Sequence, residues 1–265
     1  MISVLGIPFD NNSSFLRGPA HAPVIIRKAF HSSSSNYFTE FGTDLKDHPG
    51  WRDSGDIAFG KNAPHETIIR AVTKQLTVVS KMLLFGGDHS ITYPIVKAFA
   101  SKYPNLTIVH VDAHPDLYHD FEGNPHSHAS PFARIMENGL CKRLIQVGIR
   151  TMNTHNREQA KKYGVEVIEM KDWYNSAIDI RVDGPAYLSF DLDAIDPAFA
   201  PGLSHHEPGG FTTRQALSII QKLEPKFVGA DIVEFNPNRD INDMTAMLAA
   251  KLFKEILDLL LRSEQ

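Results

Sequence analysis

Short runs that are apolar throughout alternate with longer amphipathic stretches, and this alternation constrains the fold more than any other feature. Apolar runs without a polar face are typical of parallel strands that helices cover on both sides. The β–α order therefore predicts a parallel sheet between helices. We expect strands at residues 2–7, 53–57, 82–85, 106–111, 144–149, 165–168, 187–190 and 227–232. We expect helices at residues 64–80, 93–102, 131–138, 157–163, 213–223 and 240–262.

The chain shows neither a linker nor an internal repeat, so residues 1–265 are expected to form one domain. Residues 31–55 and 198–210 are irregular, and long loops of this kind are often functional. The serine run at 32–35 is also compatible with a solvated turn.

Charge and composition exclude several classes of protein. The net charge is −4 and no block of Lys or Arg occurs, so we expect neither nucleic acid nor a membrane surface as a partner. No apolar run reaches the roughly 18 residues of a membrane span. The opening MISVLGIPFD lacks the basic region of a secretory signal. With Cys141 as its one cysteine, the chain has no internal disulfide, and a cytoplasmic location is expected.

Ionisable residues follow several predicted strands at the point where each strand ends. Ligands of parallel α/β sheets bind beyond the carboxyl ends of the strands. Alternation along an extended segment places every second side chain on one side, which groups the members of DAHPD and of DLD. If these strand ends are neighbours, six side chains converge: His89, Asp112, His114, Asp116, Asp191 and Asp193.

Four carboxylates in a small volume raise one another's pKa and cannot all stay ionised without compensation. Two divalent cations would neutralise them, and oxygen-rich ligands with two imidazoles favour Mn²⁺ over the cysteine-rich sets of zinc. Each motif taken singly is also compatible with a capping or surface role. Asp88 and His110 are assigned structural roles, and Asp196 is assigned either to a turn or to support of the ligands.

Four motifs resemble those of the ureohydrolase family: GGDHS, DAHPD, SFDLDAIDPAFAPG and DIVEFNP. This family comprises arginases, agmatinases, guanidinobutyrases, proclavaminate amidinohydrolases and formimidoylglutamases. The segments FLRGPAHAPVIIRKAF and DLYHDFEGNPHSHASPFARI are similar to the agmatinase-like branch. The resemblance implies a three-layer α/β/α sandwich with a mostly parallel eight-stranded sheet. It also implies hydrolysis of a guanidino or amidino C–N bond and assembly as homotrimers or homohexamers.

The resemblance further implies two Mn²⁺ ions per subunit. One ion would be held by His89, Asp112, Asp116 and Asp191, and the other by Asp112, His114, Asp191 and Asp193. A hydroxide that bridges the two metals would attack the guanidinium carbon, since metals lower the pKa of bound water far below about 15.7.

Three side chains are expected to perform the remaining chemistry. Asp116 would hold the proton of the nucleophile, and Glu234 would pair with the planar guanidinium group. His128 would transfer a proton to the leaving amine, because an imidazole titrates near neutral pH. The alternatives are that His126, two residues earlier, takes this role, and that Glu234 is a surface residue after a strand.

One loop departs from the family pattern. Where many relatives read TGTPEPGG, this chain reads LSHHEPGG, which places His205, His206 and Glu207 at the expected pocket mouth. We expect Glu122 or Glu207 to receive the distal ammonium of agmatine, whereas His205 and His206 would suit the carboxylate of 4-guanidinobutyrate.

Agmatine, cleaved to putrescine and urea, is therefore the first expected substrate. Guanidinobutyrase, arginase and formimidoylglutamase activities are alternatives within the family. A metal-bound protein that senses guanidines without turnover is the alternative outside enzymes.

Overall fold

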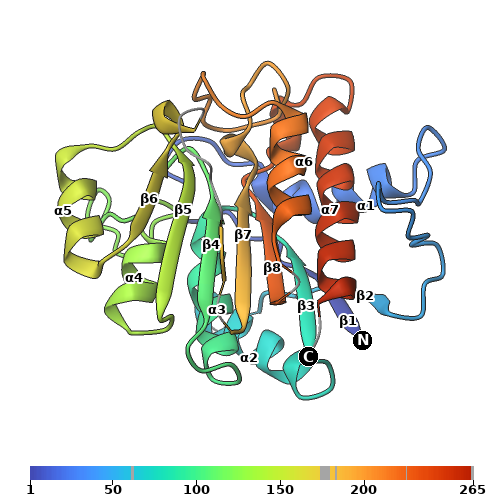
Figure 1. Ribbon diagram of the computed structural model, residues 1–265, viewed down its shortest axis with the longest axis horizontal. Coiled ribbons are helices and arrows are strands. Elements are labelled where there is room, and N and C mark those ends of the chain that lie inside the picture. The colour runs from blue at the N-terminus through green and yellow to red at the C-terminus, as the bar shows by residue number, and fades with distance from the viewer. Residues whose placement is uncertain (61–62, 174–179, 183, 225, 264–265) are drawn as a thin grey trace.

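The computed structural model describes residues 1–60, 63–173, 180–182, 184–224 and 226–263. Its eight strands form one sheet in the order β2-β1-β3-β8-β7-β4-β5-β6, and every neighbouring pair is parallel. The expected mostly parallel sheet is thus parallel throughout (Figure 1). The strands are β1 (Ile2–Gly6), β2 (Trp51–Asp56), β3 (Lys81–Phe85), β4 (Thr107–Val111), β5 (Arg143–Ile149), β6 (Glu166–Glu169), β7 (Ala186–Asp191) and β8 (Phe227–Val233).

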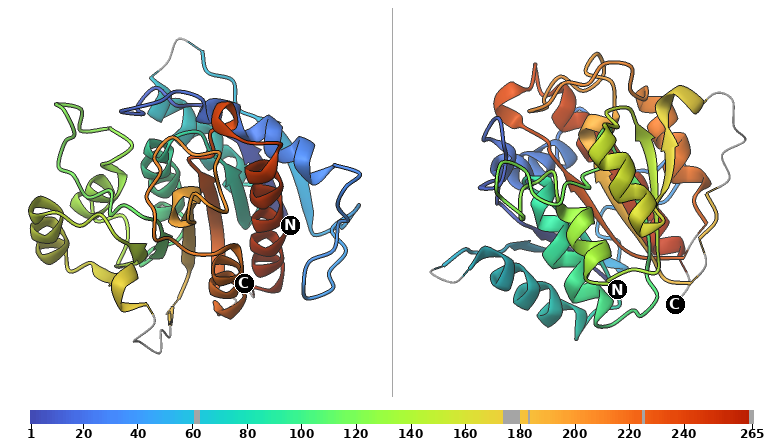
Figure 2. Two further views of the ribbon diagram at one scale, coloured as in Figure 1. Left: turned by 90° about the horizontal axis from the view of Figure 1, so that it is seen from above. Right: turned by 90° about the vertical axis from the view of Figure 1, so that its left-hand side faces the viewer.

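Helices cover both faces of this sheet, which makes the molecule a three-layer sandwich (Figure 1 and Figure 2). One buried apolar cluster joins a face of the sheet to α1, α6 and α7, and a second cluster joins the other face to α2, α3 and α4. The helices are α1 (Ala22–Phe30), α2 (Pro64–Leu76), α3 (Thr92–Ala100), α4 (Pro131–Glu137), α5 (Thr154–Tyr163), α6 (Thr213–Lys222) and α7 (Met244–Arg262). Within the described residues, no helix is both long and apolar enough to cross a membrane.

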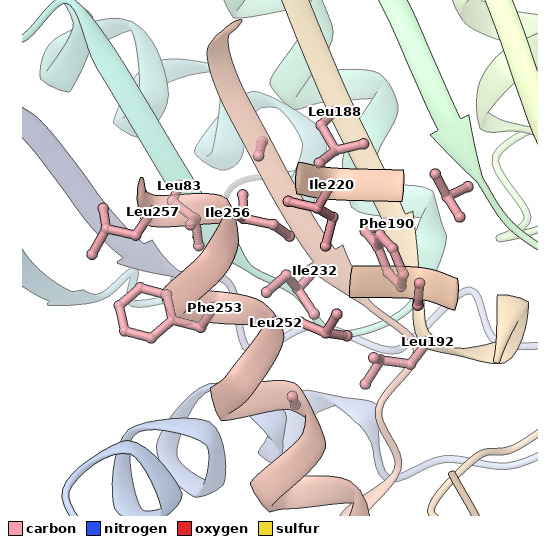
Figure 3. Packing of buried hydrophobic residues seen from close by; sticks show 14 of the residues in the cluster. Leu83, Leu188, Phe190, Leu192, Ile220, Ile232, Leu252, Phe253, Ile256 and Leu257 are labelled. Atoms are coloured by element: carbon pink, nitrogen blue, oxygen red, sulfur yellow. The ribbon is translucent and has the colours of Figure 1, made fainter. Parts of the chain in front are cut away.

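Helix α7 packs along the centre of the sheet. Phe253 is buried, and its ring meets those of Phe30, Trp51 and Phe85 at centroid distances of 5.0, 5.8 and 4.9 Å. Figure 3 shows the same cluster around the strands, with these labelled side chains: Leu83, Leu188, Phe190, Leu192, Ile220, Ile232, Leu252, Phe253, Ile256 and Leu257. This packing fixes the central strands, whose carboxyl ends carry the ionisable residues.

Helix α1 was not expected from the sequence. Its segment APVIIRKAF contains a proline, but Pro23 lies in the first turn, where the missing N–H has no helical partner to lose.

Two other helices start three or more residues away from the expected position. Helix α7 begins at Met244 rather than 240, because Asn242 and Asp243 adopt left-handed backbone conformations and the Asp240 carboxylate accepts the N–H groups of Thr245 and Ala246. Helix α5 begins three residues earlier than expected, because the Asn153 side chain caps it.

Candidate active site

The carboxyl edge of the sheet brings His89 together with three aspartates from two other strand ends. The Nδ1 atom of His89 lies 3.2 Å from Asp112, 3.0 Å from Asp116 and 3.1 Å from Asp191, measured to the nearer carboxylate oxygen. All four residues are buried. Because β3, β8, β7 and β4 are adjacent, loops that are distant in the sequence meet above the centre of the sheet.

The hydrogen bonds of His89 fix which of its ring nitrogens carries the proton. The hydroxyl group of Ser189 donates its hydrogen to Asp231. The oxygen of Ser189 therefore accepts a hydrogen bond from Nε2 of His89 at 3.0 Å. Nδ1 then presents a lone pair to the carboxylates, and it has no hydrogen-bond partner among the described residues. A lone pair facing three carboxylates is repulsive unless a positive charge lies between them, and either a metal ion or a proton on Nδ1 would supply it. Burial lowers the pKa of His89, but the three carboxylates outweigh this and raise it well above its usual value.

A second group forms around His114. Its Nδ1 atom lies 2.9 Å from Asp193 and 3.5 Å from the Oδ1 atom of Asp112. Asp112 thus belongs to both groups, through one oxygen in each, while Asp191 accepts the backbone N–H of Asp193 at 2.8 Å. All six predicted metal ligands therefore lie in one cluster. Metal binding by these residues stays a prediction.

The assignment of His110 as a structural residue is incomplete. Its Nε2 atom lies 2.6 Å from Asp112, and Gln146 donates to its Nδ1 at 3.1 Å, so Nε2 carries the proton and donates to the carboxylate. His110 thereby orients the aspartate shared by the two groups. Asp88 is structural: it caps the turn at Ser90 and accepts the backbone N–H of Asn12.

The electrostatics of the cluster support two cations. Burial, together with the charges of Asp193 and Asp112, raises the pKa of Asp191 well above its usual range. Burial also raises the pKa of Asp193 to about 6, although His114 opposes this shift. Asp191 and Asp193 thus resist ionisation in the absence of a cation. Two divalent cations would neutralise the charges of four carboxylates. The oxygen and imidazole donors fit Mn²⁺.

A cavity of about 220 Å³ opens beside this cluster. Glu234 lies at its inner end, where Oε1 accepts hydrogen bonds from the Nδ1 atom of His128 and the backbone N–H of His89, both at 2.8 Å. The other oxygen, Oε2, is buried and has no partner among the described residues. Glu234 is thus not a surface residue: it is buried and lies in the lining of the cavity. The lining consists of Ser14, His114, Pro115, Asp116, Tyr118, Phe121, His128, Ala129, Thr151, Asn156, Asp191, Asp193, His205, Glu207 and Glu234.

The structure separates the two histidines considered for proton transfer. His128 lines the cavity and is buried. Burial lowers the pKa of His128, but Glu234 outweighs this and raises it to about 9. His126 is exposed and stacks on Tyr93, with its ring 4.6 Å from that of His65.

The loop with the unusual sequence reaches the mouth of the cavity. The Oε1 atom of Glu207 lies 3.7 Å from Nε2 of His114. The ring centroids of His205 and His128 lie 5.2 Å apart. Arg150 fixes this loop by donating to the backbone carbonyl of Glu207. Asp196 holds its two ends through the backbone N–H groups of Ala198, Gly209 and Gly210, so it fixes a turn.

Two of the predicted substrate contacts lie elsewhere. Glu122 is exposed and is not among the residues that line the cavity. His206 is exposed and bonds to the carbonyl of Pro201. Conversely, sequence reasoning missed four polar residues of the lining: Ser14, Tyr118, Thr151 and Asn156. Ser14, Tyr118 and Thr151 lie in loops, and Asn156 lies in the first turn of α5. The fold brings these four residues to the cavity.

Comparison with known proteins agrees with this geometry. The model of the arginase family matches residues 1–258. The mitochondrial arginase 1 of Arabidopsis thaliana is 46% identical over 96% of this chain and 79% of its own length. An agmatinase of Chromobacterium violaceum is 34% identical over 98% of this chain and 83% of its own. The arginase structure from Medicago truncatula is 44% identical and superposes with a TM-score of 0.90, covering 96% of this chain and 86% of that one. The chain therefore belongs to the arginase family, whose members are hydrolases.

Proposed function

We propose that this protein hydrolyses the guanidino group of a small cationic substrate and releases urea, with two Mn²⁺ ions bound by the six clustered ligands. The observation that carries this proposal is the carboxylate of Glu234 in the lining of the cavity beside the cluster, where its buried Oε2 atom has no partner among the described residues. A guanidinium group supplies paired N–H donors in the geometry that a carboxylate accepts best.

The residues of the chain divide the chemistry between them. Two divalent cations, when bound, would lower the pKa of a water molecule and so supply a nucleophile at neutral pH. Glu234 would hold the guanidinium with its carbon facing the cluster. Asp116 would accept and orient the proton of the nucleophile. His128, whose Nδ1 atom is 2.8 Å from Glu234, would protonate the amine as the C–N bond breaks.

We further propose agmatine as the first substrate. Glu207 at the cavity mouth would attract a distal ammonium group, and the described residues that line the cavity include no lysine or arginine to bind a carboxylate. L-Arginine is the second candidate, because plant arginases at 44–46% identity are more similar to this chain than the agmatinases at 34%.

Urea release separates these substrates. Protein reconstituted with Mn²⁺ is incubated with agmatine, L-arginine and 4-guanidinobutyrate, and formamide release is measured from N-formimidoyl-L-glutamate. We expect the highest kcat/KM for agmatine. A higher kcat/KM for arginine would transfer the assignment to the second candidate, and no product from any of the four would contradict the proposal.

The variant Glu234→Gln tests whether Glu234 binds the guanidinium group. The amide nitrogen of Gln would face the guanidinium donors, so kcat/KM is expected to fall at least about 100-fold while bound Mn²⁺ is unchanged. An unchanged kcat/KM would remove Glu234 from substrate binding.

Cytoplasmic location and assembly as a homotrimer or homohexamer remain predictions. Cell fractionation and light scattering test them. The Arabidopsis relative is named as mitochondrial, so fractionation is to include organelles where the source cell has them.

A further inference from the structure

Ser14 lies between His128 and solvent, and neither the sequence motifs nor the proposed chemistry assigns it a role. Its hydroxyl oxygen is 2.8 Å from the Nε2 atom of His128, and its backbone N–H donates to the same atom at 3.2 Å. The other ring nitrogen of His128 bonds to Glu234. Ser14 is exposed and lines the cavity, whereas His128 is buried. The route from Nε2 of His128 to bulk water therefore passes this hydroxyl.

The loop that carries Ser14 is held firmly in this place. The backbone N–H of Asn12 donates to Asp88 at 2.9 Å, and its carbonyl accepts the backbone N–H of His128 at 3.2 Å. The Asn12 side chain bonds to Ser90 and to Asn124. These contacts of Asn12, two residues before Ser14, hold the loop next to His128.

A hydroxyl suits both protonation states of His128, whereas the backbone amide suits only one. In the imidazolium form, Nε2–H donates to the lone pairs of the Ser14 oxygen. In the neutral form with the proton on Nδ1, Nε2 accepts a hydrogen bond from the hydroxyl or from the amide. Because a hydroxyl is both a donor and an acceptor, it can pass a proton in either direction, which an amide N–H cannot do.

We propose that Ser14 is the proton-relay residue of His128, an inference that rests on the proposed function. When the amine leaves, His128 gives it a proton and becomes neutral. Nε2 is the nitrogen that gives this proton, and the remaining proton stays on Nδ1 beside Glu234. A water at the cavity mouth then donates a proton to the Ser14 oxygen while the hydroxyl proton moves to Nε2, and the hydroxide ion that forms passes into bulk solvent. Ser14 ends the step unchanged, and one proton passes from solvent to His128.

Ser14→Ala removes the relay but keeps the backbone amide that orients the ring. We expect kcat to fall about 10-fold with little change in KM, since general acid catalysis typically contributes about 10²–10⁴-fold and water replaces the hydroxyl in part. Ser14→Thr, which keeps the hydroxyl, is expected to restore kcat. The matched control is Ser13→Ala, which removes the neighbouring hydroxyl from a contact with Asp88 and is expected to leave kcat unchanged.

Buffer dependence distinguishes a relay from a structural role. The kcat of Ser14→Ala is expected to rise with imidazole concentration at constant ionic strength, because a small acid replaces the lost relay, whereas the wild-type kcat stays flat. Two results would overturn the proposal, provided that the wild-type enzyme is active. One is a Ser14→Ala variant that keeps full kcat, and the other is a variant whose lost kcat is not restored by imidazole.

A measurement that needs no substrate turnover tests the Ser14 proposal independently of the proposed function. In ¹⁵N NMR spectra of Mg²⁺-loaded protein, Ser14→Ala is expected to shift the Nε2 resonance of His128, and Ser13→Ala is not. An unshifted resonance in Ser14→Ala would contradict the Ser14 contact even if no substrate were turned over. Wild-type protein that is inactive on every guanidino compound would instead overturn the proposed function.

Discussion

At the scale of single residues, Asp112 connects both halves of the cluster. One of its oxygens lies beside His89 and the other beside His114, while His110 donates to it from behind. The alternation in DAHPD predicted that Asp112 and His114 share a side, because side chains two apart in an extended segment do so. The approach of His89 depends on the order of the strands. The role of His110 was missed, since it depends on Gln146 from the next strand.

Glu207 and Glu122 form a matched pair for testing the distal end of the substrate. Glu207 lines the cavity and Glu122 is exposed outside it. Glu207→Gln is expected to raise KM for agmatine about tenfold, equivalent to ~1.4 kcal/mol, with kcat little changed. Glu122→Gln is expected to keep both constants. Steady-state kinetics of the two variants measure this, and an unchanged KM in Glu207→Gln would exclude an ammonium contact.

The raised pKa of Asp193, about 6 in the metal-free protein, predicts a pH dependence of stability. Between the usual aspartate pKa of about 4 and pH 6, the native state holds a proton that the unfolded state has lost. The metal-free protein should therefore lose stability from this group as the pH rises through that window. Mn²⁺ must displace the same proton, so its affinity should rise with pH up to about 6.

Thermal unfolding with and without Mn²⁺, measured from about pH 4 to pH 7, tests this linkage. The increase in Tm on adding Mn²⁺ is expected to grow through this range. An increase that is equal at every pH would show that Asp193 does not titrate as proposed.

At the scale of elements, the strands were predictable from their apolar runs, and each observed strand overlaps an expected one. Helix starts were less predictable, because side-chain caps such as Asn153 and Asp240 decide them. The order of strands in the sheet does not follow from strand positions in the chain. Only this order explains why His89 and Asp191, which are about 100 residues apart, are neighbours.

Gly87 lies in the turn after β3 that places His89. Its backbone passes so close to the loop after β1 that an added Cβ would lie 1.7 Å from the carbonyl oxygen of Phe9. Gly87→Ala is expected to destabilise the fold by about 3 kcal/mol and to weaken Mn²⁺ binding, because the turn must shift. Gly60→Ala is the control, since a Cβ there meets nothing within 4 Å. Equal denaturation midpoints and Mn²⁺ affinities for the two variants would contradict this.

At the scale of the whole molecule, helices cover both faces of the sheet (Figure 2), and an apolar core lies on each face. The ionisable cluster lies at the carboxyl edge of the sheet. This architecture and the six clustered residues were predictable from the sequence. The cavity lining was not, because Ser14 and Tyr118 come from separate loops and Asn156 comes from helix α5. Substrate choice depends on such loops, so it needs measurement.

The core beneath the site is expected to determine global stability. Phe253→Ala should destabilise the protein by about 4 kcal/mol, since the ring is buried among three other aromatic rings. Phe199→Ala, at a ring that is 43% exposed, should cost less than about 1 kcal/mol. Urea denaturation measures both, and similar losses for the two variants would contradict the assigned core.

The central claim is that four aspartates and two histidines coexist here because they bind two divalent cations. Anomalous diffraction from a crystal of the Mn²⁺-loaded protein tests it most directly. We predict two peaks about 3.5–4 Å apart, one next to His89 and one next to His114, with Asp112 between them. A map without manganese between these side chains would contradict the account.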